Sequence, residues 1–318
     1  GLRFQARARP SALRGLTLDR AGRNIGGALV HYAGATLTLE QVDILDSGSA
    51  GILTHGNPGN ALDARGLRVE RATNEGVALH VNSKLLRLQD SRIAHTREAP
   101  LRLPADAVGV LDATLDLGPS PARRIEVLNS TVTASATWLP HTGTDADGPV
   151  PYRFEGGGVQ VAAPTGPVLT LADGVQIEAH NANASLSVST GALPGGLVID
   201  GHTEGVRLAP TAEAGSWLGV WFSTRTLPIS EVVGAEISGG RDANLTVSAN
   251  GHVVVRDSHL HSSRRHGVQL THGSTISLHD NVITGNDGYG VESLAGDLIA
   301  FEANDLSDNA LGPLSLPP

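Results

Sequence analysis

Three hexapeptides near the C-terminus share one pattern, and they read Val255-Arg-Asp-Ser-His-Leu260, Leu278-His-Asp-Asn-Val-Ile283 and Phe301-Glu-Ala-Asn-Asp-Leu306. In each, an apolar residue is followed by two free positions, a small or amide residue, one free position and a second aliphatic residue. Their first residues are 23 positions apart, and Val232 begins a fourth copy at the same interval. A fixed period of this length predicts stacked repeats in which each coil packs only on its neighbours.

The same pattern recurs in the N-terminal half, where copies begin at Leu39, Leu88 and Val127. The period there is 24 or 25 residues, as the positions of Gly51, Gly76 and Pro100 indicate. Short segments such as Ile276-Ser-Leu278 alternate between apolar and polar residues, which indicates strands, and no segment combines a helical period with caps. Except in the Val127 copy, Gly, Pro or Asn followed by another aliphatic residue stands seven positions after the last aliphatic residue of the motif. These pairs are Gly51-Ile52, Gly76-Val77, Pro100-Leu101, Asn244-Leu245, Gly267-Val268, Gly290-Val291 and Pro313-Leu314.

The composition fits a core built from thin aliphatic layers, because aromatic residues make up only 3% of the 318 residues. The chain has no Cys, which excludes a disulfide framework, a Cys-ligated zinc site and a thiol nucleophile. A formal net charge of -9 argues against a nucleic-acid partner, which would need a basic face. No run of 18 apolar residues is present, so we expect no membrane insertion.

The repeat resembles that of right-handed parallel β-helix proteins, the pectate-lyase-like superfamily, over most of the chain and less clearly over 140–205. The resemblance implies an all-β fold, a right-handed parallel β-helix solenoid with coils of about 23–25 residues, of the secreted or cell-surface type found in bacteria. Because the superfamily includes lyases, hydrolases, epimerases, adhesins and passive surface modules, it does not select an activity.

An ungapped match at an interval of 204 residues suggests an internal duplication, since Leu2-Arg-Phe4 faces Val206-Arg-Leu208. We therefore expect β-helix coils in 1–139, a strand-rich unit continuing the solenoid in 140–205, and a second copy of the coils in 206–318. Gly1 falls inside a coil, so the first copy is expected to be truncated and flanked by further domains of the same polypeptide. The alternative is that the first copy never had an upstream unit, because terminal repeats are often atypical.

Two columns of polar residues follow from stacking coils at the 23-residue period. One contains Ser258, Asn281 and Asn304, and the other contains Ser263, Asn286 and Asn309. The resemblance implies that these are asparagine ladders, in which side-chain amides bond to one another and to turn backbone groups. Their expected role is structural.

Asp257 and Asp280 form the best carboxylate pair, because adjacent coils would place them about 5 Å apart. Such a pair could hold Ca²⁺ against an acidic sugar, or act as the acid and nucleophile of a retaining hydrolase. The resemblance implies an Arg or Lys base in a lyase, and Arg256, in one column with His279, is the comparable residue here. The favoured interpretation is nevertheless two solvated aspartates at a bend, and we expect no cofactor. Calcium is the cofactor that the candidate catalytic residues would suggest if the pair were functional.

Histidines cluster between 252 and 279, and two of them flank the inward Leu260 at a spacing that can chelate a metal. Neighbouring arginines would repel a cation, so the favoured interpretation is a partly basic surface patch suited to an anionic or sugar ligand. The predicted ligand-binding residues are His259, His261, Arg264, Arg265, His266 and Tyr289. Trp217 and Trp221 are expected to pack in the core or at its rim, and Gly156-Gly-Gly158 is interpreted as a turn.

Taken together, these features predict a non-catalytic extracellular or cell-surface β-helical module, binding polysaccharide or another surface component as part of a larger protein. One alternative is a polysaccharide lyase or glycoside hydrolase acting at the 256–287 coils. The other is a purely structural spacer. The expected location is extracellular, at the cell surface or periplasmic.

Overall fold

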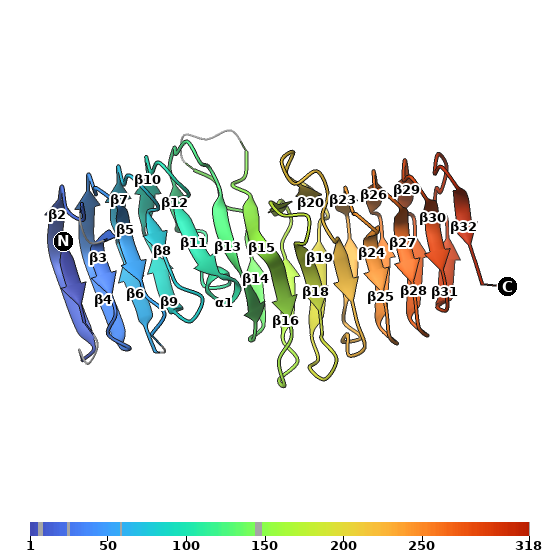
Figure 1. Ribbon diagram of the computed structural model, residues 1–318, viewed down its shortest axis with the longest axis horizontal. Coiled ribbons are helices and arrows are strands. Elements are labelled where there is room, and N and C mark those ends of the chain that lie inside the picture. Colours follow the sequence, from blue (N-terminus) through green and yellow to red (C-terminus); the bar gives the residue numbers. More distant parts are fainter. Residues whose placement is uncertain (6–8, 24–25, 58, 144–147, 318) are drawn as a thin grey trace. The chain divides into compact units, whose positions relative to one another are not determined.

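The protein is a parallel β-solenoid (Figure 1). A computed structural model describes residues 1–5, 9–23, 26–57, 59–143 and 148–317. Within these ranges the one helix is the four-residue α1 (Ala105–Val108), and the pairings between named strands are parallel. The expectation of an all-β chain with very little helix is therefore confirmed.

Contacts divide the chain into two compact units, which we describe separately. The first comprises Gly1–Leu128 and Leu139–Tyr152, and the second comprises Asn129–Trp138 and Arg153–Pro318. The division into three segments at residues 139 and 205 stays a prediction.

In the first unit, each strand hydrogen-bonds to the strand one coil away, which produces three columns. One column is β1 (Leu2–Phe4), β3 (Gly27–His31), β5 (Ala50–Thr54), β8 (Val77–Ala78), β11 (Leu101–Pro104) and β13 (Ile125–Val132), which continues into the second unit. A second is β2 (Ser11–Asp19), β4 (Thr36–Leu45), β6 (Ala61–Arg65) and β9 (Lys84–Gln89). The third follows from the later part of β4 into β7 (Arg68–Glu70), β10 (Arg92–Ala94) and β12 (Asp116–Leu117).

The second unit has the same organisation, again with three columns of parallel strands. One column is β15 (Tyr152–Val161), which begins in the first unit, β18 (Ser185–Val188), β21 (Val220–Phe222), β24 (Ala243–Val247), β27 (His266–Leu270), β30 (Tyr289–Ser293) and β32 (Gly312–Ser315). A second is β14 (Ala136–Trp138), β16 (Val168–Leu171), β19 (Gly196–Asp200), β22 (Glu231–Val233), β25 (His252–Arg256), β28 (Thr275–His279) and β31 (Asp297–Glu302). The third is β17 (Gln176–Ala179), β20 (Val206–Pro210), β23 (Ala235–Ser238), β26 (His259–His261) and β29 (Val282–Thr284).

The core consists of apolar columns at the predicted positions. Ile52, Val77 and Leu101 pair in register and are fully buried, as are Leu245, Val268 and Val291 in the second unit. Each of these aliphatic residues follows the Gly, Pro or Asn noted in the sequence, so the register predicted from that interval is confirmed. Stacking like on like removes apolar surface from water in every layer, which is the main favourable term for such a fold.

The internal duplication predicted from the match at an interval of 204 residues stays a prediction. Leu2 pairs with Leu29 on β3, and Val206 pairs with Ala235 on β23.

The motif copy that begins at Val127 lies on a different column of strands from the copy that begins at Leu88. Val127 pairs with Leu103 in the column of β11 and β13, whereas Leu88 pairs with Ala64 in the column of β6 and β9. The same aliphatic spacing thus occurs on two different columns.

Both asparagine ladders are present. In the first, Asn281 Nδ2 donates to Asn304 Oδ1 at 2.9 Å, and the backbone N–H of Ser258 donates to Asn281 Oδ1 at 3.0 Å. In the second, Asn286 Nδ2 donates to Asn309 Oδ1 at 2.8 Å. These amides satisfy turn backbone groups inside the solenoid, as the resemblance implied.

Candidate ligand-binding groove

Two adjoining pockets form a groove in the second unit, with volumes of about 280 and 320 Å³. They share Gln160 and Ser187, so the two pockets adjoin. Each lies near the lower end of the size range of small-molecule sites. The remaining lining residues are Asn129, Ser130, Thr131, Gly157, Gly158, Val159, Ser185, Ser189, Thr190, Gly191, Trp221, Ser223 and Ser248.

Two glycines, Gly157 and Gly158, line one end of the groove. Gly156, Gly157 and Gly158 lie inside β15, so the interpretation of this segment as a turn is wrong. Gly158 has a φ of +96°, and a Cβ there would overlap the backbone of Ser185 in the next coil. A Cβ on Gly157 would come 2.9 Å from Asn129 Nδ2 and would occupy space in the pocket. Glycine is therefore needed both for close approach of the strands and for the hollow itself.

Trp221 forms a wall of the groove. It lies between the buried Val220 and Phe222 on β21, and because residues alternate along a strand its side chain faces outward. The side chain is 39% exposed, and its Nε1 donates to Ser248 Oγ at 2.9 Å, which fixes the ring. Trp217, by contrast, is fully buried. The expectation that both tryptophans pack in the core or at its rim is therefore confirmed for Trp217, which lies in the core. Trp221 instead lines a pocket on the outer face.

Trp221 belongs to an outward row that runs from coil to coil. Parallel pairing aligns Gln160 with Ser187, Ser187 with Trp221, and Trp221 with Thr246. Beyond these, Thr246 aligns with Gln269, which aligns with Glu292. We call these six residues the outward row.

The groove offers hydroxyl and amide groups beside an aromatic face. Ser and Thr hydroxyls donate and accept hydrogen bonds, and Gln160 and Asn129 add amides with both functions. The sequence analysis did not select these residues, although the alternation Ser185-Leu-Ser187-Val and Val220-Trp-Phe222 signals their outward orientation. The pairing of β18 with β15 and β21, which brings them together, was not evident from the sequence.

The predicted catalytic residues lie elsewhere in this unit. Arg256 pairs in register with His279, as expected, but its guanidinium is engaged by Glu231 at 2.8 Å. His279 Nδ1 lies 3.6 Å from Glu302 Oε2. Both Asp257 and Asp280 are exposed, in agreement with the reading of solvated aspartates at a bend.

The two aspartates occupy turn positions with a left-handed backbone. Asp257 and Asp280 have φ values of +52° and +55°, and the equivalent positions one coil away hold Gly234 and Ala303, at +60° and +52°. Asp is one of the non-glycine residues that best tolerate this conformation. The turn geometry therefore gives a structural reason for these residues, and their use as a catalytic or calcium-binding pair stays a prediction.

His259 and His261 face the same way, as the sequence predicts. Their rings stack with centroids 4.2 Å apart, and His261 Nε2 lies 3.3 Å from Glu236 Oε1. Burial lowers the pKa of His259, and the neighbouring His261 adds to that effect. Among the described residues, no group of three or more His, Asp or Glu side chains is placed to hold a metal ion.

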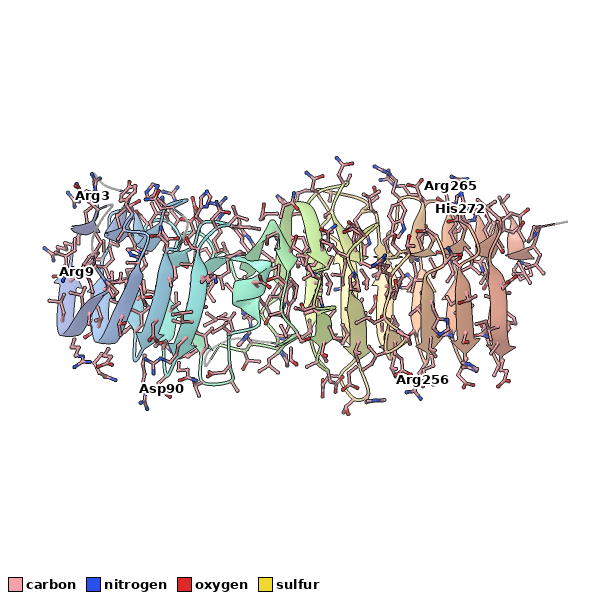
Figure 2. The ribbon with its side chains drawn as sticks, turned by 90° about the horizontal axis from the view of Figure 1, so that it is seen from below. Arg3, Arg9, Asp90, Arg256, Arg265 and His272 are labelled. Atoms are coloured by element: carbon pink, nitrogen blue, oxygen red, sulfur yellow. The ribbon has the colours of Figure 1, made fainter. Side chains whose placement is uncertain are left out.

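The remaining predicted ligand residues are not one exposed patch. Arg264 donates to the backbone oxygen of Gly215 at 3.2 Å, and Arg265 is exposed. His266 is 2% exposed and stacks on Tyr289 with ring centroids 6.0 Å apart, so its expected surface position is wrong. Figure 2 places Arg265 and Arg256 at opposite edges of this unit, so the predicted basic patch and the predicted catalytic group are separate.

His266 is instead part of a buried polar cluster. Its Nδ1 accepts a hydrogen bond from the Tyr289 backbone at 3.2 Å, and its Nε2 lies 3.1 Å from Glu292 Oε2. Burial lowers the pKa of His266, and Glu292 acts in the opposite direction. Gln269 Nε2 donates to the same carboxylate oxygen at 2.8 Å, so the cluster adjoins the outward row.

Comparison with known proteins supports the fold. Residues 224–310 match the family described as right handed beta helix region. No curated protein and no solved structure matches the chain. Within the described ranges, no helix combines the length and the apolarity needed to cross a bilayer. The family match over this part of the chain and the stacked parallel strands together show a right-handed parallel β-helix fold.

Proposed function

We propose that this β-helix protein is a non-catalytic module that binds a polysaccharide in the groove of its second unit. The observation that carries the proposal is the Trp221 ring, exposed and held in place beside two pockets lined with hydroxyl and amide groups. Polysaccharide binding suits a protein that acts outside the cell or at its surface, and we propose that location.

An aromatic ring with polar neighbours matches the chemistry of a sugar. One face of a pyranose ring presents C–H groups that pack on an indole, while its hydroxyls need hydrogen-bond partners at the edge. Ser187, Ser223 and Gln160 offer such partners around Trp221. The groove is a permanent feature of the fold, so little conformational entropy opposes binding.

Catalysis at the 256–287 coils has less support. A lyase would need a base free to remove a proton, and the Arg256 guanidinium is engaged with Glu231. The exposed turn position of Asp280 would leave its carboxylate in water rather than against a substrate. A purely structural spacer would need no groove.

Binding can be tested by affinity electrophoresis of the full chain in gels that contain different polysaccharides, followed by calorimetry on the retarding ones. Trp221→Ala should weaken binding at least about tenfold, as for a central aromatic contact. Phe301→Ala is the matched control, because Phe301 on β31 has the same exposed fraction of 39% but lies outside the groove. The proposal would be contradicted if both variants lost affinity or if neither did. It would also be contradicted if the unmodified chain bound no polysaccharide.

A further inference from the structure

None of the residues that line the groove is ionisable; they are Gly, Ser, Thr, Asn, Gln, Val and Trp. Arg225 meets the groove through its backbone N–H, which donates to Ser189 Oγ at 3.3 Å, and its side chain is not part of the lining. A carboxylate or sulfate group buried in such a groove would lose its hydration without gaining a cationic partner. The net charge of -9 further opposes a polyanion.

The groove runs across the strands, in the direction of coil stacking. Its lining comes from the end of β13, from β15, β18 and β21, which follow in that order, and from Ser248 after β24 in the next coil. At the usual strand separation these four intervals span about 19 Å. That length exceeds a single sugar ring, so the groove fits several consecutive units of an extended chain.

We infer that the ligand is an uncharged polysaccharide of flat pyranose units that lies along the stacking direction, with one ring on Trp221. This inference rests on the proposed function. Flat, equatorially substituted rings present a continuous C–H face to the indole and direct their hydroxyls sideways, toward Ser223 beside the row. Gln160 and Ser187 lie in the row itself, where they can bond the neighbouring units. Gly157 leaves room for a further unit beside Asn129.

The experiment compares uncharged with acidic oligosaccharides by titration calorimetry on the full chain. The uncharged set contains β-linked gluco-, xylo- and manno-oligosaccharides from two to six units, and the acidic set contains oligogalacturonates and oligoalginates of the same lengths. At least one uncharged series should bind at least about tenfold more tightly than either acidic series. Affinity should rise with length and then level off, because the groove has a finite span.

Salt dependence and a pocket variant provide independent readings. Raising NaCl from about 0.05 M to about 0.5 M should leave the affinity for the uncharged ligand unchanged, because screening acts only on charges. Gly157→Ala should weaken the longer oligomers and spare the shortest, with no change in melting temperature, since its Cβ meets only the flexible end of Asn129.

The outcomes separate this inference from the proposed function. Tighter binding of the acidic series, or affinity that falls with salt, would overturn the inference and leave polysaccharide binding standing. Equal affinity for di- and hexasaccharides would contradict the extended ligand. Failure of every oligosaccharide, and of the polysaccharides themselves, would remove the proposed function and the inference together.

Discussion

Asn286 Nδ2 donates to Asn309 Oδ1 across 2.8 Å, and Asn286 Oδ1 in turn accepts from the backbone N–H of Ser263 at 3.0 Å. Asn286 is 2% exposed, so its replacement leaves several buried groups without partners. Asn286→Ala should lower the free energy of unfolding by at least about 3 kcal/mol. Asp287→Ala, at the exposed neighbouring position, should cost less than about 0.5 kcal/mol. Urea denaturation of the two variants measures the difference, and equal midpoints would contradict the structural role of the ladder.

The inward column of the C-terminal coils can be tested at Leu278. Leu278 is fully buried and pairs with Val255 on one side and Phe301 on the other. Leu278→Asp would place a charge without a partner inside the stack. It should lower the free energy of unfolding by about 3 kcal/mol or more. His279→Asp, one residue along and partly exposed, should change stability by less than about 0.5 kcal/mol. If both variants melted at the same temperature, the register of this coil would be wrong.

Gly158 tests the close approach of β15 and β18. Its φ of +96° is unfavourable for any other residue, and a Cβ would overlap the Ser185 backbone. Gly158→Ala should therefore destabilise the protein by about 2 kcal/mol or more. Gly157→Ala, without a positive φ, serves as the control and should be close to neutral. Thermal unfolding followed by circular dichroism distinguishes the two; an unchanged melting temperature for Gly158→Ala would refute the strained geometry.

His141 makes stability depend on pH. Burial lowers the pKa of His141 from 6.5 to about 4, although Asp112 acts in the opposite direction. Between these two pH values the unfolded chain binds a proton that the folded chain excludes, so stability falls as the pH falls from 6.5 toward 4. A shift of this size corresponds to about 3 kcal/mol.

The contribution of His141 must be separated from those of His31, His55, His259 and His266, because the pKa of each of these is also lowered. His141→Gln stays neutral throughout, so the loss of stability between about pH 7.5 and about pH 4 should shrink in the variant by about 3 kcal/mol. Parallel pH profiles for the two proteins would show that His141 does not titrate in this way.

Calcium and uronate substrates test the catalytic alternative. Asp257 and Asp280 are two exposed carboxylates, whereas Ca²⁺ prefers six or more oxygen ligands, so calcium should raise the melting temperature only slightly. Pectate, alginate and glycosaminoglycans should yield no unsaturated product absorbing in the ultraviolet, with or without Ca²⁺. Calcium-dependent product that disappears in Asp280→Ala would place the enzyme ahead of the binding module.

The sequence predicts the repeating part of this fold better than the groove. The interval from each motif to residues such as Val268 and Val291 is constant, so it predicts which side chains stack, and the ladder amides Asn281 and Asn286 follow from the same arithmetic. The groove depends on Gln160 meeting Ser187 and Ser187 meeting Trp221, in coils whose loops differ in length. Without a constant period, no local signal specifies those pairings.

Function and folding use alternate residues of the same strand. In β21, Val220 and Phe222 fill the core while Trp221 faces the solvent, and the same alternation holds for Gln160 and Ser187. A substitution in the outward row therefore alters one coil's contribution to binding and leaves the core layer intact. Such a protein can diverge toward new ligands by single mutations, one coil at a time, with little risk of losing its fold.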